Sequence, residues 1–167
     1  MPSIEIESSQ QQRTIERSYL KIQLDEQTAA VLPMTHVQEA LIVPVGRVTS
    51  MPNMPACVMG LLNQRSRVLW VVALPQILGL HHLDIDIQNY NIVIIRVGNI
   101  PLGLAVWQVK GVVRFGSNLL QSPAGTVTPE LLPYIQGCIL QSTEVLLVLD
   151  SEAIVHAPIL KSNSVKF

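Results

Sequence analysis

The sequence is short of charged residues. Of its 167 residues, 14% are Asp, Glu, Lys or Arg, whereas an average soluble domain has about 25%. Hydrophobic residues make up 49% of the chain. So few charged side chains predict that part of the apolar surface is covered by a partner. The alternative is a surface rich in the uncharged residues Gln, Asn, Ser and Thr.

The sequence also lacks excess charge of either sign and is poor in aromatic residues. The net charge is −1, which provides no attraction to nucleic acid or to an anionic membrane. A barrel that binds single strands needs a basic groove with exposed aromatic side chains. Two Trp, three Tyr and two Phe in a balanced chain argue against one. A nucleic-acid-binding β-barrel therefore stays only as an alternative function.

Long apolar runs are missing, and cysteines are few. No run reaches the roughly 18 apolar residues of a membrane helix, so no direct membrane insertion is predicted. The N-terminal stretch "MPSIEIESSQQQR" has no basic segment followed by an apolar one, unlike a secretory signal. Cys57 and Cys138 lie in apolar surroundings. They are predicted to be buried free thiols in a reducing cytoplasm rather than a disulfide.

Motifs for catalysis or metal binding are absent from the sequence. It has no Gly-rich phosphate loop, no HExxH and no CxxC pair. His81 and His82 are neighbours in a polar linker and face opposite ways if extended, which favours a solvated linker over a metal site. Ser66 has no glycine elbow around it. We therefore predict a chain that is not an enzyme, with no catalytic residue, metal or cofactor.

What the sequence does contain is a series of β-hairpins. "YLKIQL" alternates apolar and polar residues, and "TAAVLP" returns from it. "MTHVQEALIV" leads into another strand, and "SMPNMP" is a loop because its prolines cannot join a central strand. Residues 60–72, "GLLNQRSRVLWVV", predict a hairpin that turns near Arg65 and Ser66. "YNIVIIRV" and "IPLGLAVWQV" form another, and "GCILQSTEVLLVLD" a last one before a short helix.

The order of elements occurs twice, which predicts an internal duplication. Residues 60–78 align with residues 137–155 at six identical positions in nineteen: Gly60/Gly137, Gln64/Gln141, Val68/Val145, Leu69/Leu146, Val71/Val148 and Ile77/Ile154. Chance similarity of two amphipathic hairpins is the alternative. Two related units of about five strands would each lose their exposed edges by closing into a barrel. The predicted division is a tail at 1–17, a domain at 18–156 with an internal boundary at about 80–90, and a tail at 157–167.

Polar residues within the hairpin at 60–72 are the candidate contact residues. The second hairpin is an internal control, because at the positions of Asn63, Arg65 and Arg67 it has Leu140, Ser142 and Glu144. A hairpin of this kind therefore needs no arginine in order to turn. We interpret Arg65 as a residue for contact or pairing, with a solvated turn residue as the alternative.

The order of motifs resembles the CheW family, the cytoplasmic adaptors of bacterial chemosensory arrays, and the regulatory domain of the histidine kinase CheA. "HVQEAL" carries the V-x-E of the family at Val37 and Glu39. "GLLNQRS" carries most of G-x-x-N-x-R-G, including Asn63 and Arg65, and "GLAVWQV" most of G-L-x-V-D-x-V, including Val109. The resemblance covers about residues 18–156. The chain departs from the pattern at Ser66, Trp70, Ala73 and Trp107, as a divergent member would.

The resemblance implies an all-β fold of two small five-stranded β-barrels that share an apolar layer, with short helices. It implies a scaffold without catalysis that couples a methyl-accepting receptor to a CheA-type histidine kinase in chemotaxis, phototaxis or pilus-based motility. The partners would be the kinase regulatory domain and the cytoplasmic receptor tip. The chain would be cytoplasmic and membrane-associated only through receptor arrays. A structural array filler that binds kinase but no receptor is an alternative within this class.

The resemblance also implies a set of partner-binding residues: Val37, Glu39, Asn63, Arg65 and Val109. In the family pattern the V-x-E glutamate and the N-x-R arginine pair near the receptor-binding surface. Carried over, these are Glu39 and Arg65. Such a pair would hold its two segments in register and leave the remaining donors of Arg65 for a partner. Trp70 or Trp107 is further expected to be exposed enough to lie in an interface.

Overall fold

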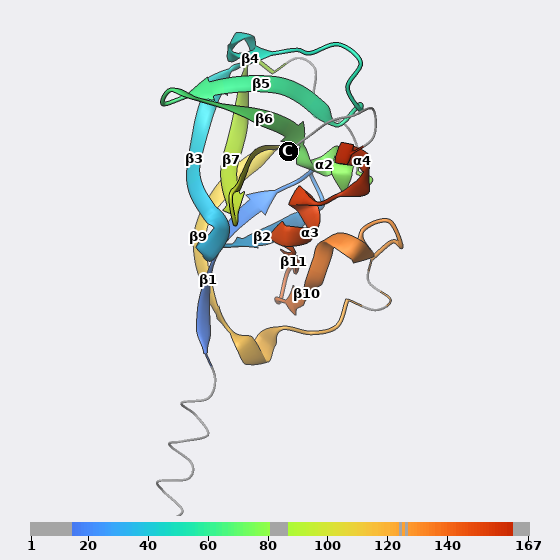
Figure 1. Ribbon diagram of the computed structural model, residues 1–167. Coiled ribbons are helices and arrows are strands. Elements are labelled where there is room, and N and C mark those ends of the chain that lie inside the picture. Colours follow the sequence, from blue (N-terminus) through green and yellow to red (C-terminus); the bar gives the residue numbers. More distant parts are fainter. Residues whose placement is uncertain (1–14, 81–86, 124, 126, 162–167) are drawn as a thin grey trace, which may run out of the picture.

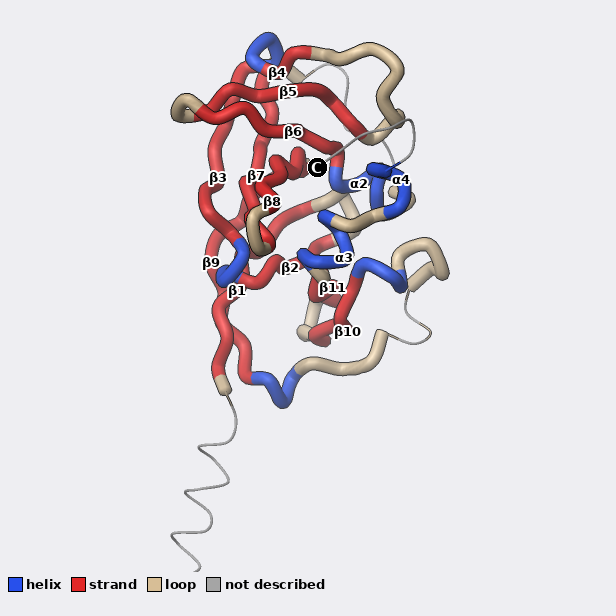
Figure 2. The backbone as a smooth tube through the Cα atoms, in the orientation of Figure 1, coloured by secondary structure: helices blue, strands red, loops and turns tan. Residues whose placement is uncertain are grey.

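The computed structural model describes residues 15–80, 87–123, 125 and 127–161, and strands make up most of them (Figures 1 and 2). The strands are β1 (Glu16–Gln23), β2 (Ala29–Pro33), β3 (Val37–Pro44), β4 (Val48–Thr49), β5 (Val58–Gln64), β6 (Arg67–Ala73), β7 (Asn89–Val97), β8 (Ile100–Val106), β9 (Gln108–Gly116), β10 (Ile135–Leu140) and β11 (Val145–Leu149). The helices are short: η1 (Met34–His36), η2 (Val45–Arg47), α2 (Leu74–Ile77), η3 (Ser117–Leu119), η4 (Leu132–Tyr134), α3 (Ser151–Val155) and α4 (Pro158–Lys161).

The strands form two curled sheets, which confirms the predicted all-β fold. Sheet A has the order β10-β11-β2-β1-β9 and lies in the lower half of Figure 1, and sheet B has the order β3-β7-β8-β6-β5-β4. Sheet B has six strands rather than five, because the short strand β4 pairs with β5. Two strand pairs are parallel, β11 with β2 and β6 with β8, and the remaining pairs are antiparallel.

The central strands of each sheet are buried on both faces, and one apolar layer is shared between the two sheets. On β7, Val93 and Ile95 belong to the shared layer, while Ile92 and Ile94 point into the interior of sheet B. Strands of sheet A divide in the same way between the shared layer and an interior of their own. Successive side chains of a strand point to opposite faces. A strand buried on both faces therefore has the continuous apolar sequence that "IVII" at residues 92–95 shows.

The two sheets are built alike. The hairpin β10–β11 with β2, β1 and β9 in sheet A corresponds to β5–β6 with β8, β7 and β3 in sheet B. The parallel pairs keep the same register, since Val148 lies opposite Val31 and Val71 opposite Gly103. Each sheet thus combines strands from both sides of the boundary predicted at about 80–90. Residues 81–86 of that boundary, with the polar linker that begins at His81, lie outside the described residues.

The described strands and helices extend into both predicted tails. Strand β1 begins at Glu16, which lies opposite Gly116 of β9. At the other end, α4 falls within the predicted tail at 157–167, and its Leu160 is fully buried together with Ala157. These two residues are three apart and on one side of a helical turn, so they join the shared layer. Residues 1–14 and 162–167 are not among those described.

Candidate interaction site

Arg65 lies at the tip of the β5–β6 hairpin. Arg65 and Ser66 form its two-residue turn and have φ angles of +52° and +64°. Positive φ at both central residues is the mark of a type I′ turn, whose twist matches that of the flanking strands. The turn that the sequence predicts is therefore present. It projects the Arg65 side chain into solvent, where 78% of its surface is exposed.

Glu39 lies on β3 beside a β-bulge. Val37 is opposite Ile95 and Glu39 is opposite Ile94, so Gln38 is the extra residue. A bulge redirects the side chains that follow it. Glu39 is directed toward the turn, and its Oε1 lies 3.3 Å from Nη2 of Arg65. The structure thus brings together Glu39 and Arg65, two residues that are far apart in sequence.

This ion pair links strands from the two edge regions of sheet B. Strand β3 is one edge of the sheet, and β5 lies next to the other edge, but the curl of the sheet brings them close. Arg47, which follows β3 in η2, adds a second link to β5. Its Nη2 donates hydrogen bonds to the Asn63 carbonyl oxygen at 2.7 Å and to Oε1 of Gln64 at 3.2 Å. Side chains therefore help to close the curled sheet at this end.

A groove opens at the same end of sheet B, and we call it the sheet B mouth. Its lining residues include Glu39, Gln64, Arg65, Arg67, Ile94 and Pro101. Arg67 precedes Leu69 and Val71 in the row of β6 side chains that faces the interior of the sheet. Leu69 and Ile94 are nearly fully buried and form the apolar base of the mouth. The groove therefore has an apolar base under a polar rim.

The rim of the sheet B mouth carries more positive than negative charge. Its ionisable residues are Glu39, Arg65 and Arg67. Glu39 pairs with Arg65. In the part of the chain that the structure describes, Arg67 makes no ion pair. The chemistry available here is ion pairing, hydrogen bonding and apolar contact.

The other predicted site residues lie at different distances from this groove. Asn63 is exposed and opposite Val68, a groove residue that is 62% exposed. Val37 is half-buried and packs against the shared layer. Val109 also packs against the shared layer, but it belongs to β9 of sheet A and does not line the groove. Of the predicted residues, Glu39 and Arg65 thus line the mouth, and Asn63 lies beside it on β5.

Sequence reasoning missed Arg67 as a groove residue. The signal was present, because Arg67, Leu69 and Val71 alternate with Val68 and Trp70 and so share a face of β6. No local pattern points to Pro101 or Ile94, because they reach the groove through the pairing of β7 and β8 in sheet B.

The two tryptophans differ in exposure. Trp107 is 42% exposed and follows β8, where its backbone N–H donates to the Gln23 carbonyl oxygen at 3.1 Å. Trp70 is half-buried and packs against the shared layer. Trp107 therefore has the exposure expected of an interface residue, and its role in an interface remains a prediction.

The described ranges contain no cluster of three or more His, Cys, Asp or Glu side chains that could hold a metal ion. The candidate histidines His81 and His82 lie outside them. None of the described helices is long and apolar enough to cross a membrane. Cys57 and Cys138 are buried and free, as predicted.

Comparisons with known proteins agree with the fold and with the motifs. The family model described as "CheW-like domain" matches residues 18–158. A chemotaxis protein CheW of Treponema pallidum (strain Nichols) is 30% identical over 112 residues, which are 65% of this chain and 66% of that protein, just under two thirds of its length. The crystal structure of the scaffolding protein TtCheW from Thermoanaerobacter tengcongensis superposes with a TM-score of 0.70 at 19% identity. That match covers 81% of this chain and 90% of the other, and it shows a shared fold.

Proposed function

The chain belongs to the CheW-like domain family, and from this premise we propose that it is a non-catalytic adaptor in bacterial taxis. In this proposal it couples a methyl-accepting chemoreceptor to the regulatory domain of a CheA-type histidine kinase. The observation that carries the proposal is the Glu39–Arg65 ion pair at the rim of an open groove. Two residues that the family pattern assigns to receptor binding meet there on the surface of this chain.

The sheet B mouth is the proposed contact surface for the receptor tip. Asn63 and Arg65 are exposed on the hairpin β5–β6, and Val68 places an apolar side chain beside them. Because the central strands of sheet B are buried on both faces and side-chain contacts link its edge regions, the rim is a rigid surface that loses little entropy on binding. Val37 and Val109 pack against the shared layer, and we propose that they support partner binding from there.

A second surface is required for the kinase. Exposed apolar side chains occur away from the mouth, among them Ile42 at 70% and Val112 at 58% exposure. A chain with so few charged residues is suited to partners on more than one face. Each contact need only be moderate, because an array multiplies them. Signalling then requires the receptor state to change these contacts unequally, since uniform binding shifts no equilibrium.

The proposal places the chain in the cytoplasm, associated with the membrane only through receptor arrays. Its output would be flagellar chemotaxis, phototaxis or pilus-based motility. The family premise and the arrangement of the mouth support this assignment.

A pull-down with the full chain from its native cell tests the proposal. We expect both a histidine kinase and a methyl-accepting receptor among the captured proteins. Arg65→Ala should reduce recovery of the receptor, whereas Ser142→Ala, the matched change in the second hairpin, should not. Capture of the kinase without any receptor would indicate an array filler and would contradict the coupling role.

A further inference from the structure

The two sheets end in matching mouths, and their residues can be compared position by position. The bulge on β9 places Val109 opposite Ile22 and Gly111 opposite Lys21. The bulge on β3 places Val37 opposite Ile95 and Glu39 opposite Ile94. Gly111 in sheet A therefore corresponds to Glu39 in sheet B, and Lys21 corresponds to Ile94.

The hairpins complete the comparison. Ser142 and Glu144 of the second hairpin correspond to Arg65 and Arg67 of the first. Sheet A thus lacks both members of the Glu39–Arg65 pair, because Gly111 and Ser142 stand in their places. The pair belongs to one mouth only, and the repeated fold forms without it.

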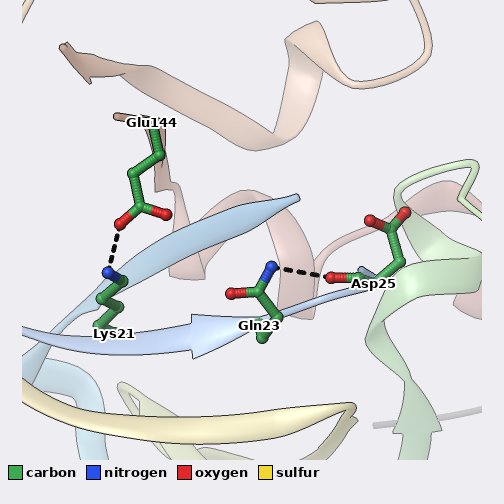
Figure 3. Close-up of polar contacts among 4 residues, drawn as sticks. All are labelled: Lys21, Gln23, Asp25 and Glu144. Carbon is green, nitrogen blue, oxygen red and sulfur yellow. Dashed lines mark hydrogen bonds and ion pairs between the residues drawn. The ribbon is translucent and has the colours of Figure 1, made fainter. Parts of the chain in front are cut away.

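The mouth of sheet A is closed by its own charges. Lys21 on β1 and Glu144 beside β11 form an ion pair there (Figure 3). Their side chains are only 23% and 32% exposed. Each lies in a row of side chains that continues inward to Tyr19 or to Leu146, both in the interior of sheet A. An acid and a base from two strands therefore satisfy each other at this rim.

The mouth of sheet B lacks the counterpart of this Lys–Glu pair. In place of Lys21 it has Ile94, which is 5% exposed, and in place of Glu144 it has Arg67. Among the described residues Arg67 forms no ion pair, and Arg65 is already paired with Glu39. One guanidinium is thus left at the rim of a groove whose base is apolar. A guanidinium in this position favours a planar anion that can accept two parallel hydrogen bonds.

We propose that the sheet B mouth binds an acidic side chain of the receptor tip, with Arg67 as the residue that selects the carboxylate. This inference rests on the proposed adaptor function and adds the chemistry of its partner. The methylene groups of a Glu or Asp side chain, or of an apolar neighbour, lie against Leu69, Ile94 and Pro101. The carboxylate meets Arg67 at the rim. A helix can present such an acidic and apolar pair on one face, at positions three or four residues apart.

Charge at the mouth favours this occupant over an anionic polymer. Only one cation is left over at the rim, and the whole chain has a net charge of −1. Nucleic acid and anionic lipid surfaces are bound through many cations. A single acidic side chain matches a single unpaired guanidinium.

The test uses the full chain with two probes: a helical hairpin fragment of the cytoplasmic tip of a methyl-accepting receptor from the same cell, and the kinase regulatory domain. Arg67→Gln should weaken tip binding about tenfold and reduce its dependence on salt. The double variant Ile94→Lys/Arg67→Glu, which installs the Lys–Glu pair of sheet A, should abolish tip binding. Glu144→Gln is the matched control and should bind the tip as the unchanged chain does. Thermal unfolding of every variant checks that the fold is retained.

The outcomes separate this inference from the function on which it rests. If Arg67→Gln binds the tip with unchanged affinity and salt dependence, the role of Arg67 is refuted while the adaptor function stands. If the unchanged chain binds the kinase domain but not the tip, the receptor-coupling function fails and this occupant fails with it. Loss of kinase binding alone in Arg67→Gln would assign the mouth to the other partner and overturn the inference. If the Arg67→Glu variant binds a tip in which one acidic residue has been changed to Lys, that residue is the one whose carboxylate contacts Arg67.

Discussion

At the residue scale, the turn at Arg65 and Ser66 holds backbone strain that the family pattern avoids. Both residues are in the left-handed region, which costs a residue with a side chain about 1 kcal/mol. Ser66 stands where the pattern has glycine. We expect Ser66→Gly to raise the free energy of unfolding by about 1 kcal/mol, measured by urea denaturation.

The second hairpin supplies the control for this substitution. Thr143 is the counterpart of Ser66 and is not among the residues with positive φ. Thr143→Gly should therefore leave stability unchanged or lower it, because glycine only adds entropy to the unfolded chain. Equal effects of the two substitutions would show that turn geometry is not the cause.

The Glu39–Arg65 pair should contribute more to binding than to stability. Arg65 is 78% exposed and Glu39 is 26% exposed, and ion pairs of this kind contribute roughly 0.2–1 kcal/mol. In a double-mutant cycle with Arg65→Ala and Glu39→Ala, we expect a coupling energy in that range from denaturation. We expect both single variants to lose receptor-dependent kinase activation.

Two results would contradict this prediction. Single variants with full coupling activity would make Arg65 a solvated turn residue. A double variant that loses as much binding as the two singles summed would show that the residues act independently. Arg65→Lys should also bind poorly, because an ammonium does not reproduce the two-pronged geometry of a guanidinium.

The buried thiol of Cys57 gives a pH-dependent prediction. Burial raises the pKa of Cys57 above its usual value, since desolvation disfavours the thiolate. The folded state therefore binds this proton more tightly than the unfolded state. The contribution of this proton to the free energy of unfolding is fully present below the pKa that Cys57 has in the unfolded chain. It is lost as the pH rises from that value through the higher pKa of the folded state.

Thiol labelling checks the burial of Cys57 on which this prediction depends. With a thiol-specific reagent at pH 8, the native chain should label at the rate of unfolding, and urea should make both cysteines react at once. Rapid labelling of Cys57 in the native state would mean that the segment around it opens without global unfolding.

At the scale of elements, the glycines at 60 and 137 have the same task in the two hairpins. A Cβ on Gly60 would lie 2.1 Å from the Thr49 carbonyl oxygen, and one on Gly137 would lie 2.4 Å from that of Gln121. Each glycine follows a bulge in its strand. Thr49 in β4 and Gln121 in a single bridge close their respective sheets at the same place. The close approach of backbone there requires glycine.

Alanine substitutions test this requirement. We expect Gly60→Ala to lower the free energy of unfolding by about 2–4 kcal/mol, because it adds a backbone clash to a positive φ of +144°. Gly137→Ala should cost about 1–3 kcal/mol from the clash alone. Gly46, with nothing within 4 Å of its Cβ position, is the control and should change stability by less than about 0.5 kcal/mol. A harmless Gly60→Ala would mean that β4 can leave the sheet without loss.

The hairpins could be predicted from the sequence because their signals are local. Alternation and the turn residues at Arg65 and Ser66 lie within a few positions of one another. Strand β4 has two residues, which are too few to show a period, so the sequence does not predict it. The parallel pairs β6–β8 and β11–β2 depend on contacts between distant segments, which no local pattern specifies. For the same reason Arg65 was found and the groove beside it was not.

At the scale of the whole molecule, the two repeats exchange hairpins, because each sheet contains two strands from the other half of the chain. Strands β1 and β2 precede the predicted boundary, yet they complete the sheet that contains β9, β10 and β11. Strands β7 and β8 follow it and complete the sheet of β3 to β6. The order of elements along the chain is the same whether a repeat folds on itself or exchanges a hairpin. The duplication was therefore visible in the sequence, whereas the exchange was not.

The exchange predicts that neither half of the chain folds alone. A fragment of residues 1–80 would lack the two strands that lie between β3 and β6 in sheet B, and its β1–β2 hairpin would have no sheet to join. An isolated two-stranded hairpin is marginally stable at best. We expect fragments 1–80 and 81–167 to show no cooperative thermal unfolding separately and to form a one-to-one complex when mixed, measured by circular dichroism and sedimentation.

The exchange of hairpins also connects the two sheets physically, as transmission of a signal between them requires. If each half folded by itself, a flexible joint would separate the two sheets, and a movement at the mouth of sheet B would not reach sheet A. With the exchange, β7 carries Ile94 at the mouth and Ile95 in the shared layer, and the shared layer also contains Leu20 and Ile22 of β1. In the proposed function, a shift of β7 on receptor binding would therefore repack side chains that touch both sheets. A cooperative melt of residues 1–80 alone would contradict the exchange and remove this physical connection between the two proposed partner surfaces.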